Sequence, residues 1–259
     1  EKSGNAENDD RDRGDNLDLH ATTSARGCVM RSILRAFLLL VICAPAWAQL
    51  NLSGLAAFSE RDIATGLREA LTQGAGRAVD LLGTHDGFLG NPKVRIPLPE
   101  VLQKAEPLMR MTGRGKDFDA LVTTMNRAAE AAVPEARALL ADAVRQLTVE
   151  DAKKILGGGD DSVTQYFRQH TEAGLTERFL PVVRQHTERL ALAGQYNRLA
   201  GQASGFGLMK AEDAQIESYV TRKALDGLYL MIAEEERAIR ANPVQAAGTW
   251  ARRIFGAVK

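Results

Sequence analysis

The stretch AQIESYVTRKALDGLYLMIAEEERAIRA, residues 214–241, carries the strongest pattern in this 259-residue chain. Its apolar side chains recur at helical spacing and cover a wide arc of the helix that they predict. The residues on this arc are Ile216, Val220, Leu225, Leu228, Met231, Ile232 and Ile239. A helix that is apolar over a wide arc is surrounded by other elements, so the stretch predicts the central helix of a bundle.

Amphipathic stretches earlier in the chain predict helices that surround this one. The first has its apolar series at Phe118, Leu121, Val122, Met125, Ala129 and Ala132. Pro134 interrupts it and suits the first turn of a second helix. The buried stripe of that second helix is Leu139, Leu140, Ala143, Val144 and Leu147. Thr148 has the form of an N-cap, and the glycines at 157–159 end the short helix that it starts.

The pattern predicts two further helices before residue 214. One runs through Val163, Tyr166, Phe167 and His170. The other opens at Leu175, contains Pro181 near its start, and carries Phe179, Val182, Val183, His186, Leu190 and Ala193 on one side. A glycine-rich link at Gly201, Gly205 and Gly207 follows. Asn242 and Pro243 end the central helix and start a last one with Trp250, Ile254 and Phe255.

Residues 88–98 break the helical pattern, because Pro92 and Pro97 forbid a regular helix there. We expect a short extended or hairpin strap, followed by a helix from Pro99 that kinks near Pro107. The sequence therefore predicts an all-α fold: a single, helical bundle-like domain over residues 49–259 with this one strap.

Residues 30–48 have the order of a secretory signal peptide. A basic start precedes the apolar run Ala36–Ala44, and small residues stand at Ala46 and Ala48. The run is shorter than the roughly 20 residues that cross a bilayer. We therefore expect cleavage after Ala48, no integral membrane anchor, and a periplasmic location.

Residues 1–29 show no apolar period and carry seven acidic side chains. We expect them to be a non-native or disordered extension, with Met30 as the natural start. Both cysteines, Cys28 and Cys43, precede residue 49, so the predicted domain folds without a disulfide. Cys43 is an alternative lipid attachment site, but Ile42 stands where a small residue is expected. We favour cleavage after Ala48 over a lipoprotein.

The charge balance excludes a strongly basic nucleic-acid binder. The chain has 33 basic and 33 acidic side chains. Residues 1–48 hold six basic and seven acidic ones, which leaves 27 basic and 26 acidic in residues 49–259. A net charge this small gives no large field to steer the domain toward DNA or an anionic membrane, so we expect no nucleic-acid partner.

His170 and His186 are candidates for an interior site, because both fall on predicted apolar faces. A hydrogen-bonded structural role is the more common alternative for such a histidine. Neither histidine belongs to a His-Glu-x-x-His zinc motif, and residues 49–259 contain no cysteine. We therefore expect no metal and no cofactor.

Glu235 is the candidate acid, because the pattern places it along the apolar stripe of the central helix while Glu234 and Glu236 reach solvent. A buried carboxylate needs a partner or a proton, and Arg184 and His186 are candidate partners. One interpretation is a buried ion pair that fixes the helix register. The other is an acid/base pair of Glu235 and His186 with a raised pKa on the carboxyl.

Arg95 is the candidate binding residue of the strap, with Arg184 and His170 as further candidates elsewhere. A rigid, proline-rich strap has little conformational entropy to lose when a partner docks. The alternative is that the strap closes one end of the helical core, with Val94, Ile96 and Leu98 as plugs.

Several segments resemble the bacterial domain-of-unknown-function family 4197. They are NPKVRIPLP at 91–99, MNRAAEAAVP at 125–134, DAKKIL at 151–156, YVT at 219–221 with ALDGL at 224–228, and IRANP at 239–243. The match runs in order from about Leu52 to Phe255. The resemblance implies an exported, largely helical protein of mainly Gram-negative bacteria, and it implies no catalytic residue, cofactor or substrate.

Two hypotheses for function remain open from the sequence. The first is a non-catalytic binding module that takes a protein partner or an apolar small molecule between its helices. The second is a periplasmic enzyme that uses Glu235 and His186 in an internal cavity.

Overall fold

The computed structural model describes residues 59–207, 210–242 and 252–253. These residues form an all-α fold, and none of them lies in a β-strand, so the predicted fold class is confirmed. The chain divides into Glu1–Gln49 and Leu50–Lys259, and everything described below belongs to the second part. The predicted signal peptide, the extension before it, and the predicted last helix with Trp250, Ile254 and Phe255 lie outside the described residues.

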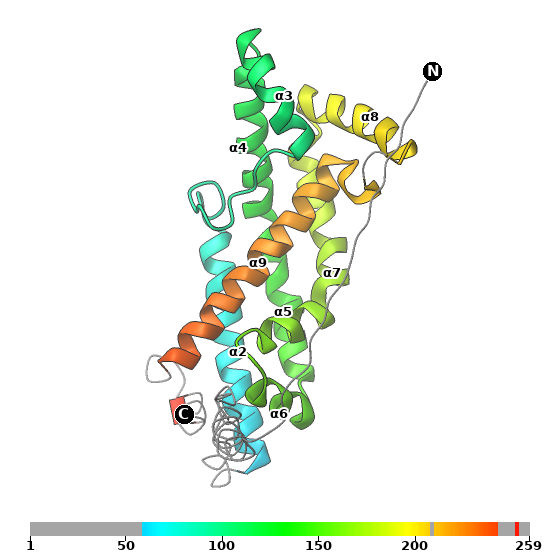
Figure 1. The fold of residues 1–259 in the computed structure, drawn as a ribbon. Coiled ribbons are helices and arrows are strands. Elements are labelled where there is room, and N and C mark those ends of the chain that lie inside the picture. Colours follow the sequence, from blue (N-terminus) through cyan, green and yellow to red (C-terminus); the bar gives the residue numbers. More distant parts are fainter. Residues whose placement is uncertain (1–58, 208–209, 243–251, 254–259) are drawn as a thin grey trace, which may run out of the picture. The chain divides into compact units, whose positions relative to one another are not determined.

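Most of the helices follow one another with short connections, whereas residues 83–99, which contain the strap, join α2 to α3 (Figure 1). They are α2 (Glu60–Leu82), α3 (Glu100–Met111), α4 (Gly115–Ala132), α5 (Ala136–Gln146), α6 (Val149–Gly157), α7 (Ser162–Thr187), α8 (Ala191–Gly205) and α9 (Ile216–Ala241). Single 3-10 turns lie at Val133–Glu135, between α4 and α5, and at Ala211–Asp213, before α9. Pro134 sits in the first of these turns, as its missing N–H favours.

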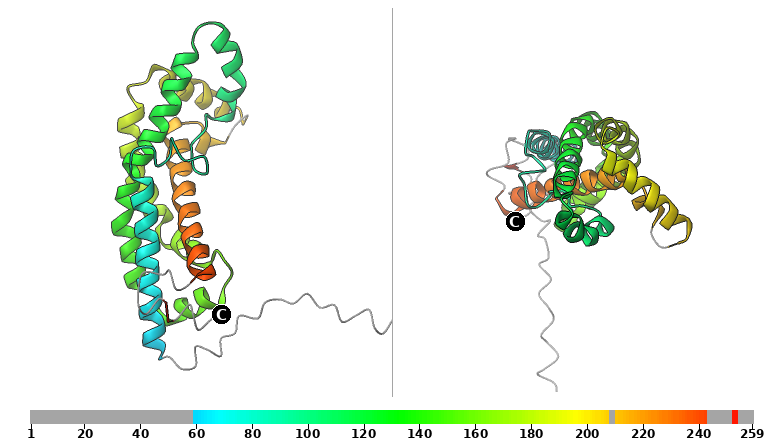
Figure 2. Two further views of the ribbon diagram at one scale, coloured as in Figure 1. Left: turned by 90° about the vertical axis from the view of Figure 1, so that its left-hand side faces the viewer. Right: turned by 90° about the horizontal axis from the view of Figure 1, so that it is seen from above.

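Helix α9 is the centre of the bundle. It packs against α7, α2 and α4, and all seven residues of its predicted apolar arc are buried (Figures 1 and 2). Helix α7 runs antiparallel to it, because Val163 at the start of α7 contacts Glu236, and Thr187 at its end contacts Glu217. The prediction of a central helix is confirmed.

Two helices begin with reciprocal caps. The Ser59 hydroxyl accepts from the Asp62 N–H at 3.2 Å, while the Asp62 carboxylate accepts from the Ser59 N–H at 3.2 Å. Thr148 and Asp151 form the same capping box at the start of α6, where the sequence predicted a helix start. Each cap satisfies N–H groups that the first helical turn leaves without partners.

The predicted break between residues 170 and 175 is wrong, because α7 is one continuous helix of 26 residues. Thr171 and Leu175 are both buried, so packing outweighs the low helix propensity of Gly174 between them. The helix instead ends at Thr187, and α8 begins at Ala191, within the span that was predicted as one helix. Gly201 lies inside α8 and not in a link.

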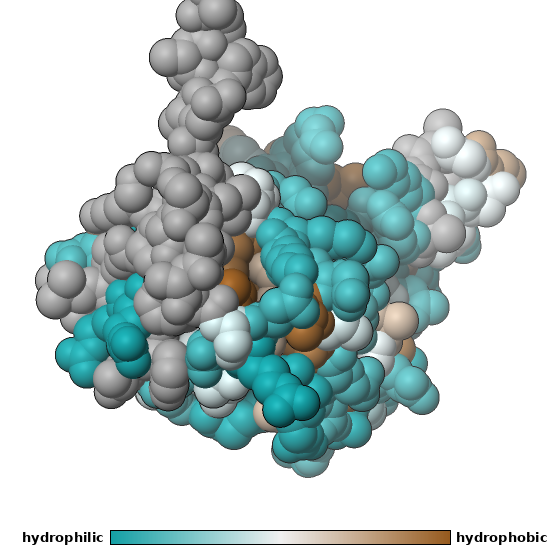
Figure 3. Space-filling model, turned by 90° about the horizontal axis from the view of Figure 1, so that it is seen from below, coloured by the Kyte–Doolittle hydropathy of each residue, from teal (hydrophilic) through white to brown (hydrophobic). Residues whose placement is uncertain are grey.

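The core is apolar, whereas the face of the molecule shown in Figure 3 is mainly hydrophilic. In the view of Figure 3, hydrophobic residues of the described part show as small areas between hydrophilic ones. No helix among the described residues is long and apolar enough to cross a membrane.

Gly227 in α9 marks a close approach of the strap to the bundle. A Cβ atom at Gly227 would lie 2.8 Å from Cε1 of Phe88 and 3.3 Å from Cβ of Val94. Phe88 is fully buried, so its ring has little space to move away.

We predict that Gly227→Ala lowers the free energy of unfolding by about 1–3 kcal/mol, because the added methyl overpacks the contact with Phe88. Gly201→Ala in α8 is the matched control, since a Cβ there meets nothing within 4 Å. That change should stabilise the protein by about 0.5–1 kcal/mol. Urea denaturation of both variants measures the effects, and equal stabilities would contradict the account.

Candidate functional site: an apolar groove between α3, α4 and α8

The strap is held by side chains of α4. The Asn126 amide accepts from the Ile96 N–H at 2.8 Å and donates to the Ile96 carbonyl at 2.9 Å. The Glu130 carboxylate accepts from the N–H groups of Phe88 and Leu89, both at 3.0 Å. Asn126 and Glu130 are themselves buried, so they satisfy backbone groups that a non-helical segment would otherwise bury without partners.

The three expected plugs, Val94, Ile96 and Leu98, are buried, and the strap therefore closes part of the core. Residues 92–94 form a turn and residues 95–99 have no regular secondary structure, so no strand and no hairpin forms there. Arg95 points away from this core and is exposed. Its backbone N–H donates to the Asn91 carbonyl at 2.9 Å, but its guanidinium has no ion-pair or hydrogen-bond partner among the described residues, so it stays available as the binding candidate of the strap.

We predict that Arg95→Ala leaves the free energy of unfolding within about 0.5 kcal/mol of the wild type, since it removes an exposed side chain. Ile96→Ala, one residue further on, should cost about 2–5 kcal/mol because it opens a cavity beneath the strap. Thermal and urea unfolding compare the pair. A large loss for Arg95→Ala would show that Arg95 has a structural role.

The buried carboxylate of the EEE run is Glu236 and not Glu235. Its side chain accepts from the Val163 N–H at 3.2 Å and from the Ser162 hydroxyl at 3.2 Å, and it pairs with Arg240 at 2.9 Å. These donors lie at the start of α7, where unpaired N–H groups favour a negative charge. The expectation that Glu236 reaches solvent is therefore wrong. The buried carboxylate lies one residue after Glu235, which is a rotation of about 100° around the helix axis.

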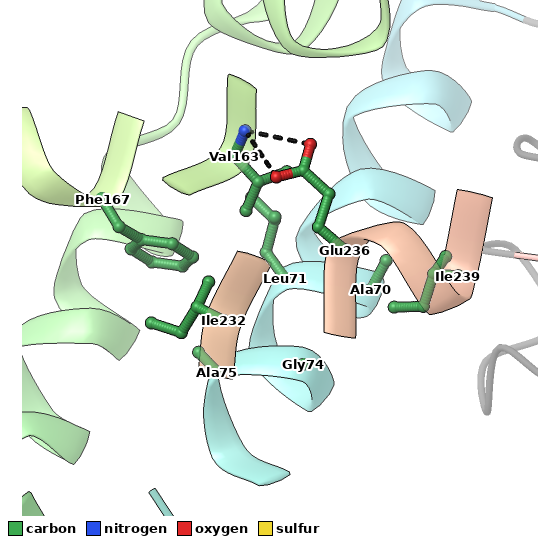
Figure 4. A pocket seen from close by; sticks show the side chains of 9 residues that line it. All are labelled: Ala70, Leu71, Gly74, Ala75, Val163, Phe167, Ile232, Glu236 and Ile239. Carbon is green, nitrogen blue, oxygen red and sulfur yellow. Dashed lines mark hydrogen bonds between the residues drawn. The ribbon is translucent and has the colours of Figure 1, made fainter. Parts of the chain in front are cut away.

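A small cavity of about 20 Å³ lies beside Glu236 (Figure 4). It is lined by Ala70, Leu71, Gly74, Ala75, Val163, Phe167, Ile232, Glu236 and Ile239, from α2, α7 and α9. This volume holds about one water molecule, which is too little for a substrate. Burial raises the pKa of Glu236 above its usual value, although the Val163 N–H and Arg240 oppose the shift.

The other candidate acid/base residues lie on the surface and far apart. Glu235 is partly exposed and pairs with Arg77 at 3.3 Å. Arg184 and His186 are exposed near the C-terminal end of α7. Glu235 lies at the opposite end of α7, because its neighbour Glu236 accepts from the Val163 N–H at the start of that helix. At 1.5 Å per residue along the antiparallel helix α7, His186 is about 35 Å from that point. The structure does not bring Glu235 together with Arg184 or His186.

His170 is also exposed, against the prediction that it lies on an apolar face. Its Nδ1 atom lies 2.8 Å from the Tyr166 carbonyl, and its ring is 4.3 Å from the Tyr166 ring. Both residues line a polar depression of about 370 Å³ with Lys154 and Gln165 among its other lining residues. Among the described residues, no group of three or more His, Cys, Asp or Glu side chains is placed to hold a metal ion.

We predict that Glu236→Gln changes how stability depends on pH. The raised pKa means that the folded protein holds this proton more tightly than the unfolded chain, so ionisation destabilises the fold. As the pH rises from about 4 to about 7, the wild type should lose stability relative to Glu236→Gln. The Tm difference between the two proteins measures this loss, and a difference that stays constant or moves the other way would contradict the raised pKa.

An apolar depression lies elsewhere, between α3, α4 and α8. We call it the groove; it measures about 390 Å³. Its lining residues are Val101, Leu102, Ala105, Met109, Phe118, Leu192, Gln195, Tyr196, Leu199 and Ala200. Phe118 and Tyr196 are buried at its base, whereas Val101 and Leu199 are 56% and 68% exposed.

Two exposed hydrophobic side chains, Val101 and Leu199, lie on the walls of this groove. Seven large hydrophobic residues of the described chain are exposed, and five of them belong to α3, to α8 or to the residue that caps α8. These five are Val101, Leu108, Met111, Leu199 and Phe206. Val101 and Leu199 extend the apolar lining of the groove to the surface, and exposed apolar surface that continues a buried lining is typical of interaction sites.

Buried polar anchors place both walls of the groove. The strap leads directly into α3, whose N-cap is Pro99, and the Tyr219 hydroxyl of α9 donates to the Pro97 carbonyl at 3.0 Å. On the other side, Asn197 of α8 donates to the buried Glu217 carboxylate of α9 at 2.9 Å. The Asn197 carbonyl oxygen accepts from the Ile216 N–H at 2.8 Å. Both walls are therefore fixed to the N-terminal end of α9.

The groove was not predicted from the sequence. The sequence of α3 contains one indication of it. Apolar residues occur around much of this helix, so that few positions form a polar, solvent-facing surface; they are Val101, Leu102, Leu108, Met109 and Met111. Periodicity shows that a helix has an apolar face, but it does not show whether another element covers that face.

The described residues form an all-helical protein with an open apolar groove, in which Glu235 and His186 lie apart. The chain belongs to the family described as "Protein of unknown function (DUF4197)", whose model matches residues 57–256. This match confirms the family suggested by the sequence. No curated protein and no solved structure matches the chain.

Proposed function

We propose that this protein is a non-catalytic binding module that takes an apolar small molecule into the groove between α3, α4 and α8. The observation that carries the proposal is the groove itself: about 390 Å³ of space with an almost wholly apolar lining. Ligand sites of about 300–1,000 Å³ with apolar walls and few polar groups are typical of small-molecule binding.

The alternative, an enzyme built on Glu235 and His186, has less support. The two side chains lie near opposite ends of α7, and neither lines a cavity with the other. Glu236, the carboxylate with a raised pKa, has its oxygens occupied by Val163, Ser162 and Arg240. A carboxylate that caps a helix in this way is a structural group.

The proposed place of action is the periplasm. The order of basic, apolar and small residues in 30–48 supports export with cleavage after Ala48, and the absence of cysteine from residues 49–259 suits a domain that folds without disulfides. Docking of a protein partner at the exposed Arg95 is a second proposal, supported by a guanidinium that has no partner within the described part of the chain and by the anchoring of the strap to Asn126.

We predict that the protein binds the uncharged fluorophore N-phenyl-1-naphthylamine with enhanced emission, because the apolar walls exclude water from the dye. Ala105→Trp should weaken binding by about tenfold or more, since the indole fills the groove. Ala173→Trp, on the exposed surface of α7, is the matched control and should bind as the wild type does. Fluorescence titration measures all three proteins, and equal binding by both variants would place the dye outside the groove.

A further inference from the structure

Among the described residues, no charged side chain lines the groove, and its ten lining residues are apolar except for Gln195 and Tyr196. The cations of the neighbouring α3 are paired: Lys104 with Glu100 at 2.7 Å, and Arg110 with Glu106 at 2.7 Å and with Asp119. Lys116 of α4 and Arg198 of α8 are exposed and lie outside the lining. An anionic group held among the lining residues would therefore lose its hydration without gaining a cation.

Gln195 is the polar group that a ligand can use. The Tyr196 hydroxyl already donates to the Asp213 carbonyl. The Gln195 amide has no hydrogen-bond partner among the described residues, and it is half-buried in the wall. A primary amide both donates and accepts, so it matches a hydroxyl, ester or amide group.

The depth of the groove favours a single chain over the broad face of a helix. The lining reaches down to the buried residues Leu102, Phe118 and Tyr196, below the exposed walls at Val101 and Leu199. A flexible alkyl chain reaches them.

We infer that the groove binds uncharged amphiphiles, in which an alkyl chain carries a hydroxyl, ester or amide group, in preference to the fatty-acid anion of the same length. The chain lies between Leu102, Phe118 and Leu199, and the polar group bonds to Gln195. This inference rests on the proposed function, and it adds that the groove selects ligands without a charge.

The test is competition against bound N-phenyl-1-naphthylamine, using the full protein at about pH 8, where a fatty acid is ionised. Below their aggregation limits, 1-decanol and decanoate present the same chain with and without a charge. We expect 1-decanol to displace the dye at a concentration lower by about tenfold or more, because decanoate must bury an unpaired charge.

A gain-of-function variant sharpens the test. Gln195→Lys places a cation in the wall and should reduce the preference for 1-decanol to about threefold or less. Gln202→Lys, exposed on the same helix and outside the lining, should leave the preference unchanged. Circular dichroism checks folding, and Leu199→Lys at the groove rim supplies the same charge if Gln195→Lys does not fold.

The outcomes separate the two proposals. Dye binding with equal displacement by decanoate and 1-decanol would overturn the charge selection and leave the proposed function intact. No dye binding by the wild type would overturn both. A dimer in sedimentation that becomes monomeric in Leu199→Asp, together with no dye binding, would assign the groove to a second copy and would also overturn both.

Discussion

The amide of Asn126 pairs with both backbone groups of Ile96, and much of the structure depends on this contact. The strap has no helical hydrogen bonds of its own, so its buried N–H and C=O groups need partners from elsewhere. Asn126 and Glu130 of α4 provide them, and Val94, Ile96 and Leu98 can then fill the core. Two of the segments that carry the family resemblance, 91–99 and 125–134, contain the residues on the two sides of this contact.

The same kind of contact links the fold to the groove. The anchored strap fixes the point at which α3 begins, and Glu217 with Asn197 fixes α8. Helices α3 and α8 therefore stand as two placed walls over Phe118 of α4, and their facing apolar residues are left uncovered. The proposed site is a consequence of polar groups buried outside it, because hydrophobic packing alone does not specify where these walls stand.

The helices were largely predictable and the site was not. The apolar arc of 214–241 and the Thr148 cap fixed the central helix and the start of α6, because periodicity and capping are local signals. The break near Gly174 was predicted wrongly because long-range packing of Thr171 and Leu175 outweighs local propensity. Identifying Glu236, and not Glu235, as the buried carboxylate required the contact with Val163 on another helix, which no local pattern contains.

Amide hydrogen exchange at Ile96 tests the central claim most directly. If the Asn126 side chain holds the strap as described, the Ile96 N–H should exchange as slowly as amides in the middle of α4 and should become fast in Asn126→Ala. An Ile96 amide that already exchanges at the rate of an open loop in the wild type would show that the strap is not anchored, and would remove the basis for the placed walls of the groove.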